Sequence, residues 1–469
     1  MVVEALVLRV EQGVHEVLRH PVEGHGDEPP YAKLRHEGPV AGEDPHRRLG
    51  AEIEVALRSR NLRVQIEITA SQCENRPTDT GHAEPDNGPQ DRSAAPRHGR
   101  PTPRPQRTGP SQGDTAVRHR WNKSDSLVGL DIGSTSVKLL ELSKHDGRHR
   151  VEAFGVEPLP PNAVVDRNIS DLDSVGEAIR QLVARTAPRA RRAATALPDS
   201  AAITRIVEMD ASLSDEAMQS RITAEAGRHI PFPLEEVAMD FEVQNLSERN
   251  PEQVEVLLAV CRRDEVERRE GAMRLGGLRP HVVEMEAQAI QRAAVHAGPT
   301  TGGAGRPASL SVLDIGAGVT RLHAFDGARQ PQVQEQHFGG NRLTAELRRR
   351  YAMSDAEAFA ALRRRELPPD AEEAVLQGFR VALVAEAARA MRLFHASTDR
   401  PVGNVLLAGG AAALPGLADL LGDALAAPTG VADPCAGMTL APRVDGQALA
   451  ACAPALLTAC GLALRAFDR

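Results

Sequence analysis

Cysteine is scarce and unpatterned in this chain of 469 residues. Five cysteines are present, and none of them forms a C-x-x-C pair: Cys73, Cys261, Cys435, Cys452 and Cys460. A disulfide framework or a structural zinc site would need closely grouped cysteines, so the sequence excludes both as the basis of the fold. Free thiols of this kind fit a reducing compartment.

An excess of positive charge is also missing. The chain has 56 lysines and arginines against 64 aspartates and glutamates, a net charge of -8. A surface that attracts nucleic acid or an acidic membrane would need the opposite balance. We therefore expect no nucleic-acid partner, and contact with a membrane only through other proteins.

The sequence shows neither a secretory signal nor a strongly apolar run of spanning length. Residues 1–20 carry Glu4, Arg9 and Glu11 where a signal peptide would be apolar. The longest uncharged run, 448–464, is rich in alanine and contains Pro454. A span needs about 20 strongly apolar residues, so we expect a buried helix here and a cytoplasmic protein.

The first 125 residues differ in composition from the rest. Between Glu74 and Arg120 the only large aliphatic residue is Val117. Such a segment buries too little apolar surface to offset its ordering entropy, and we expect it to be disordered. Two interpretations stand: a tail used for tethering, or a misassigned start in a gene whose translation begins near Val117. Composition favours the second.

From residue 126 onwards the chain alternates strand and helix patterns. Strand patterns are predicted at 127–133, 137–143, 151–160, 194–209 (strand, turn, strand), 237–263 (a pair), 309–327 (a pair) and 402–408. Helical patterns are predicted at 174–186, 214–230, 265–277, 285–298, 342–396, after the turn at 409–412, and at 447–467. A Gly/Pro-rich break at 298–309 divides the two halves.

The first of three glycine turns follows the strand at 127–133. The candidate binding residues of this turn are Asp131, Gly133, Ser134, Thr135, Ser136 and Lys138. Small residues in a hairpin turn expose successive backbone N–H groups, which can hold a phosphate. Lys138 adds a point charge, and it is one of only four lysines in a chain rich in arginine. Asp131 can hold hydrated Mg²⁺.

The other two turns have related designs. Asp314, Gly316, Gly318 and Thr320 repeat the theme of an acid that ends a strand before glycines, and Asp314 is the second candidate ligand for Mg²⁺. In the third turn, Gly409, Gly410 and Ala411 follow a strand and would let a flat base lie against the backbone. A helix starting near Leu414 would offer its N-terminus to an anion.

The three turns in this order resemble the actin/Hsp70/sugar-kinase superfamily, and further segments narrow the resemblance to the PilM family of type IV pilus assembly proteins. The segments that carry it are GLDIGSTSVKLLEL (129–142), ALPDSAAITRIVEM (196–209), GRHIPFPLEEVAMDFEV (227–243), GGLRPHVVEMEAQAI (276–290), FGGNRLTAEL (338–347), AGGAAALPGL (408–417) and GLALR (461–465). The match covers 126–469.

The resemblance implies an α/β fold of two lobes that clamp ATP and Mg²⁺. It implies a first lobe at 126–297 with a small α+β subdomain of the SHS2 type inserted at about 194–284. A second lobe would cover 309–469, with the C-terminal helix returning to the first lobe. Residues 1–125 lie outside the resemblance.

The resemblance also implies further site residues. Gly339 and Gly340 belong to the FGG segment, and Glu357 to an Ala-Glu pair near the ribose. Two departures from the family pattern remove expected contacts with the nucleoside. Ala360 stands where a lysine is usual, and Ala411 stands where a further glycine is usual. In the wider superfamily an acid near Glu286 can orient the attacking water, which makes Glu286 the candidate catalytic residue. An acidic first helical turn explains the same residue without function.

Family members are cytoplasmic components of the pilus inner-membrane platform, so the resemblance implies an ATP-binding scaffold with slow or no hydrolysis. Its implied partners are the N-terminal peptide of a PilN-like membrane protein and the pilus assembly ATPase machinery. One alternative is an FtsA-like polymerising actin homologue, but we see no basic amphipathic helix at the C-terminus of the sequence. Another is a small-molecule kinase, which would need a positioned aspartate base.

Overall fold

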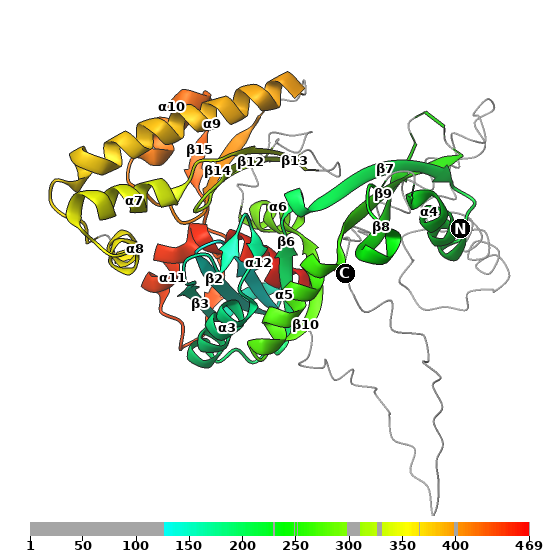
Figure 1. The fold of residues 1–469 in the computed structure, drawn as a ribbon, viewed down its shortest axis with the longest axis horizontal. Helices are drawn as coiled ribbons and strands as arrows, with labels where there is room; N and C mark the ends of the chain where they lie inside the picture. The colour runs from blue at the N-terminus through cyan, green and yellow to red at the C-terminus, as the bar shows by residue number, and fades with distance from the viewer. Residues whose placement is uncertain are drawn as a thin grey trace, which may run out of the picture. The chain divides into compact units, whose positions relative to one another are not determined.

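The computed structural model describes residues 126–468, with gaps at 228–229, 248, 251, 298–309, 326–330, 365 and 398–401. The predictions made for 1–125 lie outside the described residues. The described chain is mixed α/β and contains a six-stranded sheet, a five-stranded sheet, a three-stranded sheet and a two-stranded ribbon (Figure 1).

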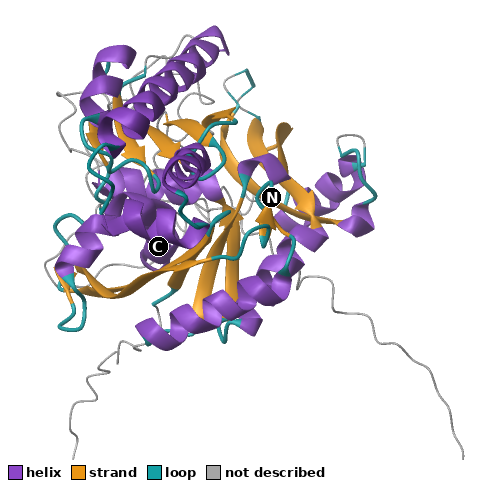
Figure 2. Ribbon diagram, turned by 60° about the vertical axis from the view of Figure 1, so that its left-hand side comes forward, coloured by secondary structure: helices purple, strands orange, loops and turns teal. Residues whose placement is uncertain are grey.

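The six-stranded sheet is the core of what we call the first lobe, and its order is β10-β6-β1-β2-β3-β16. Its strands are β1 (Val128–Ile132), β2 (Ser136–His145), β3 (Arg148–Pro158), β6 (Arg192–Leu197), β10 (Arg279–Met285) and β16 (Thr439–Leu440). Helices α3 (Leu172–Thr186) and α5 (Arg263–Leu275) cover one face, while α6 (Glu286–Ala297) and α12 (Leu457–Leu464) cover the other (Figures 1 and 2). Both faces are therefore buried.

A separate three-stranded sheet is inserted between β6 and α5. It consists of β7 (Ala202–Asp210), β9 (Gln253–Arg262) and β8 (Val237–Leu246), in that order, and α4 (Asp215–Ala226) supplies Met218 and Ile222 to its core. The predicted strand-turn-strand at 194–209 is present, but its two strands belong to different sheets. The inserted sheet spans 202–262, while both ends of the predicted 194–284 insertion pair within the first lobe.

The five-stranded sheet is the core of the second lobe, and its order is β13-β12-β11-β14-β15. The strands are β11 (Leu310–Ile315), β12 (Thr320–Phe325), β13 (Gln332–Gln336), β14 (Asn404–Ala408) and β15 (Thr429–Val431). Its helices are α7 (Gly340–Tyr351), α8 (Asp355–Arg364), α9 (Gln377–Ser397) and α10 (Leu417–Leu425). The last of these begins later than the predicted Leu414, because Gly416 before it has a φ of 70°.

The C-terminal segment packs back onto the first lobe. Gly446–Phe467, which includes α11 (Gly446–Cys452) and α12, is long and apolar enough to cross a membrane, yet 67% of its apolar window is buried within the protein. Every residue of α12 is buried. The prediction of a buried helix is confirmed, with a 3₁₀ stretch at Ala453–Leu456 around Pro454.

Two glycines let α12 approach the first lobe at backbone distance. A Cβ on Gly461 would lie 1.8 Å from the carbonyl oxygen of Ala289 in α6. A Cβ on Gly129 in β1 would lie 2.0 Å from the carbonyl oxygen of Ala459. Such contacts are backbone to backbone, so no rotamer change can relieve an added side chain.

An ion cluster fixes the same helix. Glu284, at the end of β10, is fully buried and accepts from Arg292 at 2.9 and 3.0 Å and from Arg465 at 3.0 Å. Arg292 also donates to the Gly461 carbonyl at 2.7 Å. The C-terminal helix is thus attached by polar contacts as well as by apolar packing.

Gly461→Val should destabilise the protein by about 3 kcal/mol, because the side chain forces α6 and α12 apart. The control is Gly378→Ala in α9, where an added Cβ has no atom within 4 Å. It should be neutral or slightly stabilising. Urea unfolding of both variants measures the difference, and equal midpoints would contradict the close α6–α12 contact.

His323 is a buried polar residue without a partner. It lies on β12 opposite Val312, is 0% exposed and stacks against Phe325 with ring centroids 6.2 Å apart. Neither ring nitrogen has a hydrogen-bond partner among the described residues. Burial, and secondarily the charge of Arg167, lowers the pKa of His323 from 6.5 to about 3. The folded protein therefore holds this imidazole neutral.

Acid should destabilise the wild type through this group. Below pH 6.5 the unfolded chain binds a proton at His323 that the folded chain excludes, so stability falls as pH drops towards 3. At about 1.4 kcal/mol per pH unit, the loss is about 2 kcal/mol at pH 5. His323→Leu should remove this part of the pH dependence, whereas His145→Leu, at an exposed position, should not. Parallel curves of unfolding free energy against pH for the wild type and His323→Leu would contradict the assigned role of His323.

Candidate functional site

Two β-hairpins of the same construction face one region of the described structure. In the first, Asp131 lies directly across from Lys138 on β2, and the Gly133 N–H closes the turn on the Ser136 carbonyl at 3.0 Å. In the second, Asp314 lies across from Arg321 on β12, and the Gly316 N–H bonds the Val319 carbonyl at 3.0 Å. Each hairpin therefore pairs an acid with a base seven residues later.

The hairpins border a cavity of about 1950 Å³, which residues from both lobes line. Fourteen residues predicted from the sequence line it: Asp131, Gly133, Ser134, Thr135, Ser136, Lys138, Glu286, Asp314, Gly316, Gly318, Gly340, Gly409, Gly410 and Ala411. Ala360, the residue noted as a departure, lines it as well. The structure thus brings together turns that lie almost 280 residues apart in the sequence.

Three predicted residues are not among the lining residues. Thr320 is buried, and its hydroxyl donates to the Phe338 carbonyl at 2.7 Å. Gly339 lies behind the second turn, where a Cβ would come within 2.5 Å of the carbonyl oxygens of Gly316 and Ala317. These two residues therefore support the second turn but do not line the cavity.

Glu357 is the third predicted residue that does not line the cavity. It caps the N-terminus of its own helix, α8. Its carboxylate accepts from the Ser354 N–H at 2.8 Å and from the Ser354 hydroxyl at 2.7 Å. This is a capping box, which satisfies an unpaired N–H at a helix start. The sequence pattern S-x-x-E at 354–357 signals this role as well as the ribose contact that the resemblance implies.

The Gly-Gly turn is shaped for close approach. Gly409 has a φ of 91°, and a Cβ there would lie 2.2 Å from the Ile315 carbonyl oxygen of the second hairpin. Gly410 faces open space, with no atom within 4 Å of an added Cβ. Glycine is thus required at 409 by geometry, while Gly410 leaves a flat opening into the cavity.

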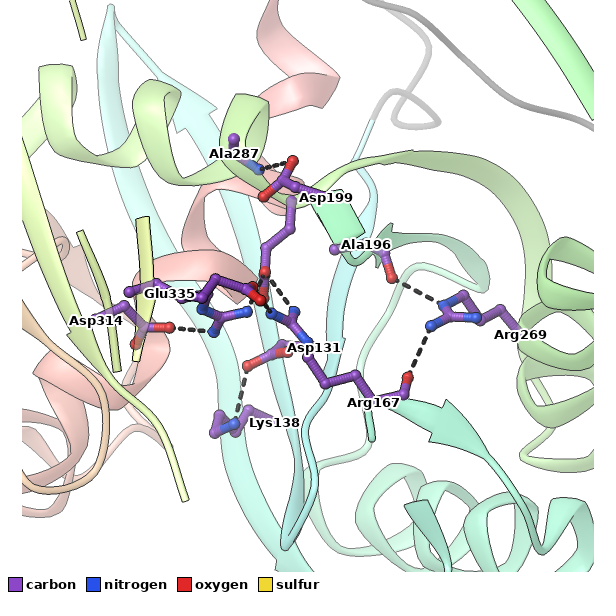
Figure 3. Close-up of polar contacts among 11 residues, drawn as sticks. Asp131, Lys138, Arg167, Ala196, Asp199, Arg269, Ala287, Asp314 and Glu335 are labelled. Atoms are coloured by element: carbon purple, nitrogen blue, oxygen red, sulfur yellow. Dashed lines mark hydrogen bonds and ion pairs between the residues drawn. The ribbon is translucent and has the colours of Figure 1, made fainter. Parts of the chain in front are cut away.

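Opposite charges from both lobes meet in this cavity (Figure 3). Lys138 donates to Asp131 at 2.9 Å. Arg321 donates to Glu286 at 2.6 Å and also pairs with Asp314. Glu286 in turn pairs with Arg167 of the first lobe. Glu286, the first residue of α6, thus receives one guanidinium from each lobe.

Arg167 is held in an unusual backbone conformation. It occupies the turn between β4 (Val164–Val165) and β5 (Asn168–Ile169), where Asp166 and Arg167 have φ values of 48° and 69°. Two positive φ values make a type I′ turn, which is costly for residues other than glycine and asparagine. Arg269 of α5 stabilises it by donating to the Arg167 carbonyl at 3.1 Å and to the Ala196 carbonyl at 3.1 Å (Figure 3).

Burial perturbs the carboxylates of the cluster. Desolvation, and then the nearby Glu286, raises the pKa of Asp314 from 3.8 to about 7. The same two causes raise the pKa of Asp199, which accepts from the Ala287 N–H at 3.2 Å, to about 7. Burial also raises the pKa of Glu286, although Arg167 opposes it. Burial therefore disfavours the charged forms of these carboxylates, and the nearby charge of Arg167 opposes this effect in all three.

The sequence reasoning missed Arg321 and Arg167. Arg321 had a signal: D-I-G-x-x-x-x-K at 131–138 and D-I-G-x-x-x-x-R at 314–321 align residue for residue, so Arg321 occupies the place of Lys138. No comparable signal marked Arg167, because its role comes from a turn conformation and from Arg269 on a distant helix.

Comparison with known proteins identifies the family. The model of the family described as type IV pilus assembly protein PilM matches residues 129–467. The chain belongs to the PilM family. A solved PilM–PilN type IV pilus biogenesis complex contains a chain that is 26% identical, with a TM-score of 0.57 over 73% of this chain and 98% of that one.

The mixed α/β fold agrees with the fold class that the resemblance predicted. Weaker likenesses include the ethanolamine utilization protein EutJ from Carboxydothermus hydrogenoformans (18% identity, 72% of this chain, 89% of that chain, TM-score 0.43). MreB 5 of Spiroplasma citri, solved bound to AMPPNP, is 14% identical over 65% of this chain and 91% of that chain, with a TM-score of 0.36.

The cavity residues fit a nucleotide better than they fit a bound metal. The turns offer backbone N–H groups, hydroxyls and Lys138, and the flat opening at Gly410 suits a base. Among the described residues no group of three or more His, Cys, Asp or Glu side chains is arranged for a metal ion. Asp314, predicted as a ligand, is already bound by Arg321. Asp131 is likewise paired, with Lys138, and Mg²⁺ at Asp131 and Asp314 stays a prediction.

Glu286→Ala should destabilise the fold by about 3–5 kcal/mol, because it leaves two buried guanidinium groups without their carboxylate. The predicted catalytic role alone would not change stability in this way. Thermal and urea unfolding test it, with the exposed Glu177→Ala in α3 as the control expected to change little. An unchanged unfolding midpoint in Glu286→Ala would show that the carboxylate is not a structural partner.

Proposed function

We propose that the chain is a cytoplasmic ATP-binding scaffold of the type IV pilus inner-membrane platform. It binds the N-terminal cytoplasmic peptide of a PilN-like membrane protein and reaches the inner membrane through such partners. The observation that carries this proposal is the large cavity between two matching hairpins and a Gly-Gly turn, in a chain of the PilM family.

In this proposal the phosphates of ATP bind against the two hairpin turns. The backbone N–H groups and hydroxyls at 133–136 hold one side, and the glycine turn at 316–319 holds the other. Lys138 supplies charge, and the nucleoside lies beside Gly409, Gly410 and Ala411. Mg²⁺, when present, would neutralise phosphate charge beside Asp131. In this proposal Gly339 and Thr320 support the second turn and do not contact the nucleotide.

Hydrolysis should be slow or absent. Glu286, the carboxylate best placed for a catalytic role, is engaged by Arg167 and Arg321. Both guanidinium groups bond the same carboxylate oxygen, Oε2, and fix the orientation of the group, so Glu286 is held for a structural role. This supports a regulatory role for the nucleotide.

The inserted sheet offers a place for an extended peptide. Its order, β7-β9-β8, leaves β7 as an edge strand, and Ile206 on β7 is 49% exposed. Phe232, between α4 and β8, is 37% exposed. A peptide can add to such an edge by main-chain hydrogen bonds while an exposed apolar side chain packs against it. We therefore propose that the PilN-like peptide binds along β7 near Ala201–Ile206, or alternatively at the region around Phe232, which precedes β8 on the other side of β9.

A short connection joins the cleft to β7. Asp199, in the 3₁₀ turn Asp199–Ala201, accepts from the Ala287 N–H at the start of α6, next to Glu286. Ala202 then begins β7. A change at Glu286 on nucleotide binding would thus act on the segment that enters the edge strand. This contact supports coupling between ATP and the peptide, and through the peptide to the pilus assembly ATPase machinery.

Lys138→Ala should lower the affinity for ATP by roughly 10- to 100-fold, since it removes a charge-assisted contact worth about 1.5–3 kcal/mol. Calorimetric titration with ATP measures this loss. The cytoplasmic peptide of a PilN-like protein should be retained by the wild type in a pull-down, with a yield that changes when ATP is added. Lys138→Ala should show the same yield with and without ATP.

Lys144→Ala is the matched control, because Lys144 lies exposed at the far end of the same strand. It should behave as the wild type in both assays. Unchanged ATP affinity in Lys138→Ala would remove the phosphate role of this lysine. Failure of the folded wild-type protein to retain the peptide in either condition would contradict the scaffold proposal.

A further inference from the structure

Arg321 is the basic residue of the second hairpin, and its surroundings differ from those of Lys138 in the first. Lys138 pairs with Asp131 of its own hairpin. Arg321 pairs with Asp314 of its own hairpin and also crosses to Glu286 of the first lobe, with N–O 2.6 Å. One guanidinium therefore joins two carboxylates from different lobes, which a lysine would do less well because it lacks a planar fork.

The Arg321 side chain is enclosed yet reaches the cavity. It is 8% exposed, and Arg321 is among the residues that line the cavity. Its two terminal nitrogens are used by Glu286 and Asp314, but Nε has no partner among the described residues. A buried N–H donor without a partner is costly, and a ligand oxygen that reached it would remove this cost.

The carboxylates that the hairpins and α6 present to this end of the cavity already have cationic partners. Asp131 pairs with Lys138, Asp314 with Arg321, and Glu286 with both Arg321 and Arg167. A divalent cation between Asp314 and Glu286 would have to displace the guanidinium that binds both. Two positive charges would then compete for the same oxygens at short range.

We propose that Arg321 is a resident cation of the cleft, which takes the position of a divalent metal between Asp314 and Glu286 and makes nucleotide binding independent of Mg²⁺. This inference rests on the proposed ATP binding and specifies its mode: phosphate charge is offset by Lys138 and Arg321. The predicted role of Asp314 as a metal ligand is replaced by a role in holding Arg321.

The test is the affinity for ATP, measured by calorimetry in excess Mg²⁺ and in excess EDTA. Wild-type affinity should differ by less than about threefold between the two buffers. Arg321→Gln should lose roughly 10- to 100-fold in EDTA, the value of a charge-assisted contact. In Mg²⁺ it should recover at least tenfold, because Asp314 loses its guanidinium partner and Glu286 keeps only Arg167, so that the ion can bind between them. Arg321→Lys, which keeps the charge, should retain most of the affinity in EDTA.

Arg180→Gln is the matched control, because Arg180 is exposed on α3 and pairs with Glu177 of the same helix, away from the cleft. It should match the wild type in both buffers. A wild type that binds ATP only with Mg²⁺ would overturn the inference while leaving ATP binding intact. Absence of binding in both buffers would overturn both. If Arg321→Gln fails to fold, the affinities of the wild type in the two buffers and of Arg321→Lys in EDTA still test the inference.

Discussion

Glu286 accepts guanidinium groups from two lobes, and the site depends on this interaction. Arg167 reaches it from a turn of the first lobe and Arg321 from β12 of the second. The Arg167 side chain also lies 3.7 Å from Glu335 on β13, so charges cross between the lobes in both directions. Buried ion pairs of this kind contribute little net stability, but losing one member is expensive. The cluster therefore specifies how the lobes meet more than it strengthens the fold.

The surrounding structure explains how such a cluster can form in a protein interior. Arg269, only 3% exposed, holds the turn that presents Arg167, and α12 holds α6 through contacts in which glycine replaces side chains. Glu284, two residues before Glu286, anchors the same junction to Arg292 and Arg465. The start of α6 is thereby fixed from the sheet, from the C-terminal helix and from the second lobe. A charged group fixed in this way pays its ordering entropy during folding and not at ligand binding.

Much of this could be predicted from local sequence. The hairpins at 127–143 and 309–325, the three glycine turns and the buried C-terminal helix follow from short patterns whose physics is local: small residues in turns and alternating or continuous apolar runs. The order of the three turns along the chain then indicated the fold class. Arg321 was also predictable, because it aligns with Lys138 when the two hairpins are superimposed as sequences.

Arg167 and the role of Glu357 were not predictable in the same way. Arg167 matters because a left-handed turn aims it at Glu286, and that conformation is maintained by a helix about a hundred residues away. Glu357 satisfies both a capping pattern and a resemblance to a ribose contact, and only coordinates show which oxygen bonds which group. The division between the first lobe and the inserted sheet also depends on pairing at a distance: β6 and β7 are adjacent in sequence, but strand pairing assigns them to different sheets.

The same cluster bears on why a nucleotide would regulate this protein without being consumed. In the proposed function Glu286 has a structural role and does not orient an attacking water, since its Oε2 accepts from both Arg167 and Arg321. A triphosphate entering beside Lys138 and Arg321 competes with Asp131, Asp314 and Glu286 for these cations. In the proposed function, weakening one guanidinium contact at Glu286 would act on the start of α6, where the Ala287 N–H bonds Asp199 just before β7. Allosteric links typically couple two sites by about 1–3 kcal/mol.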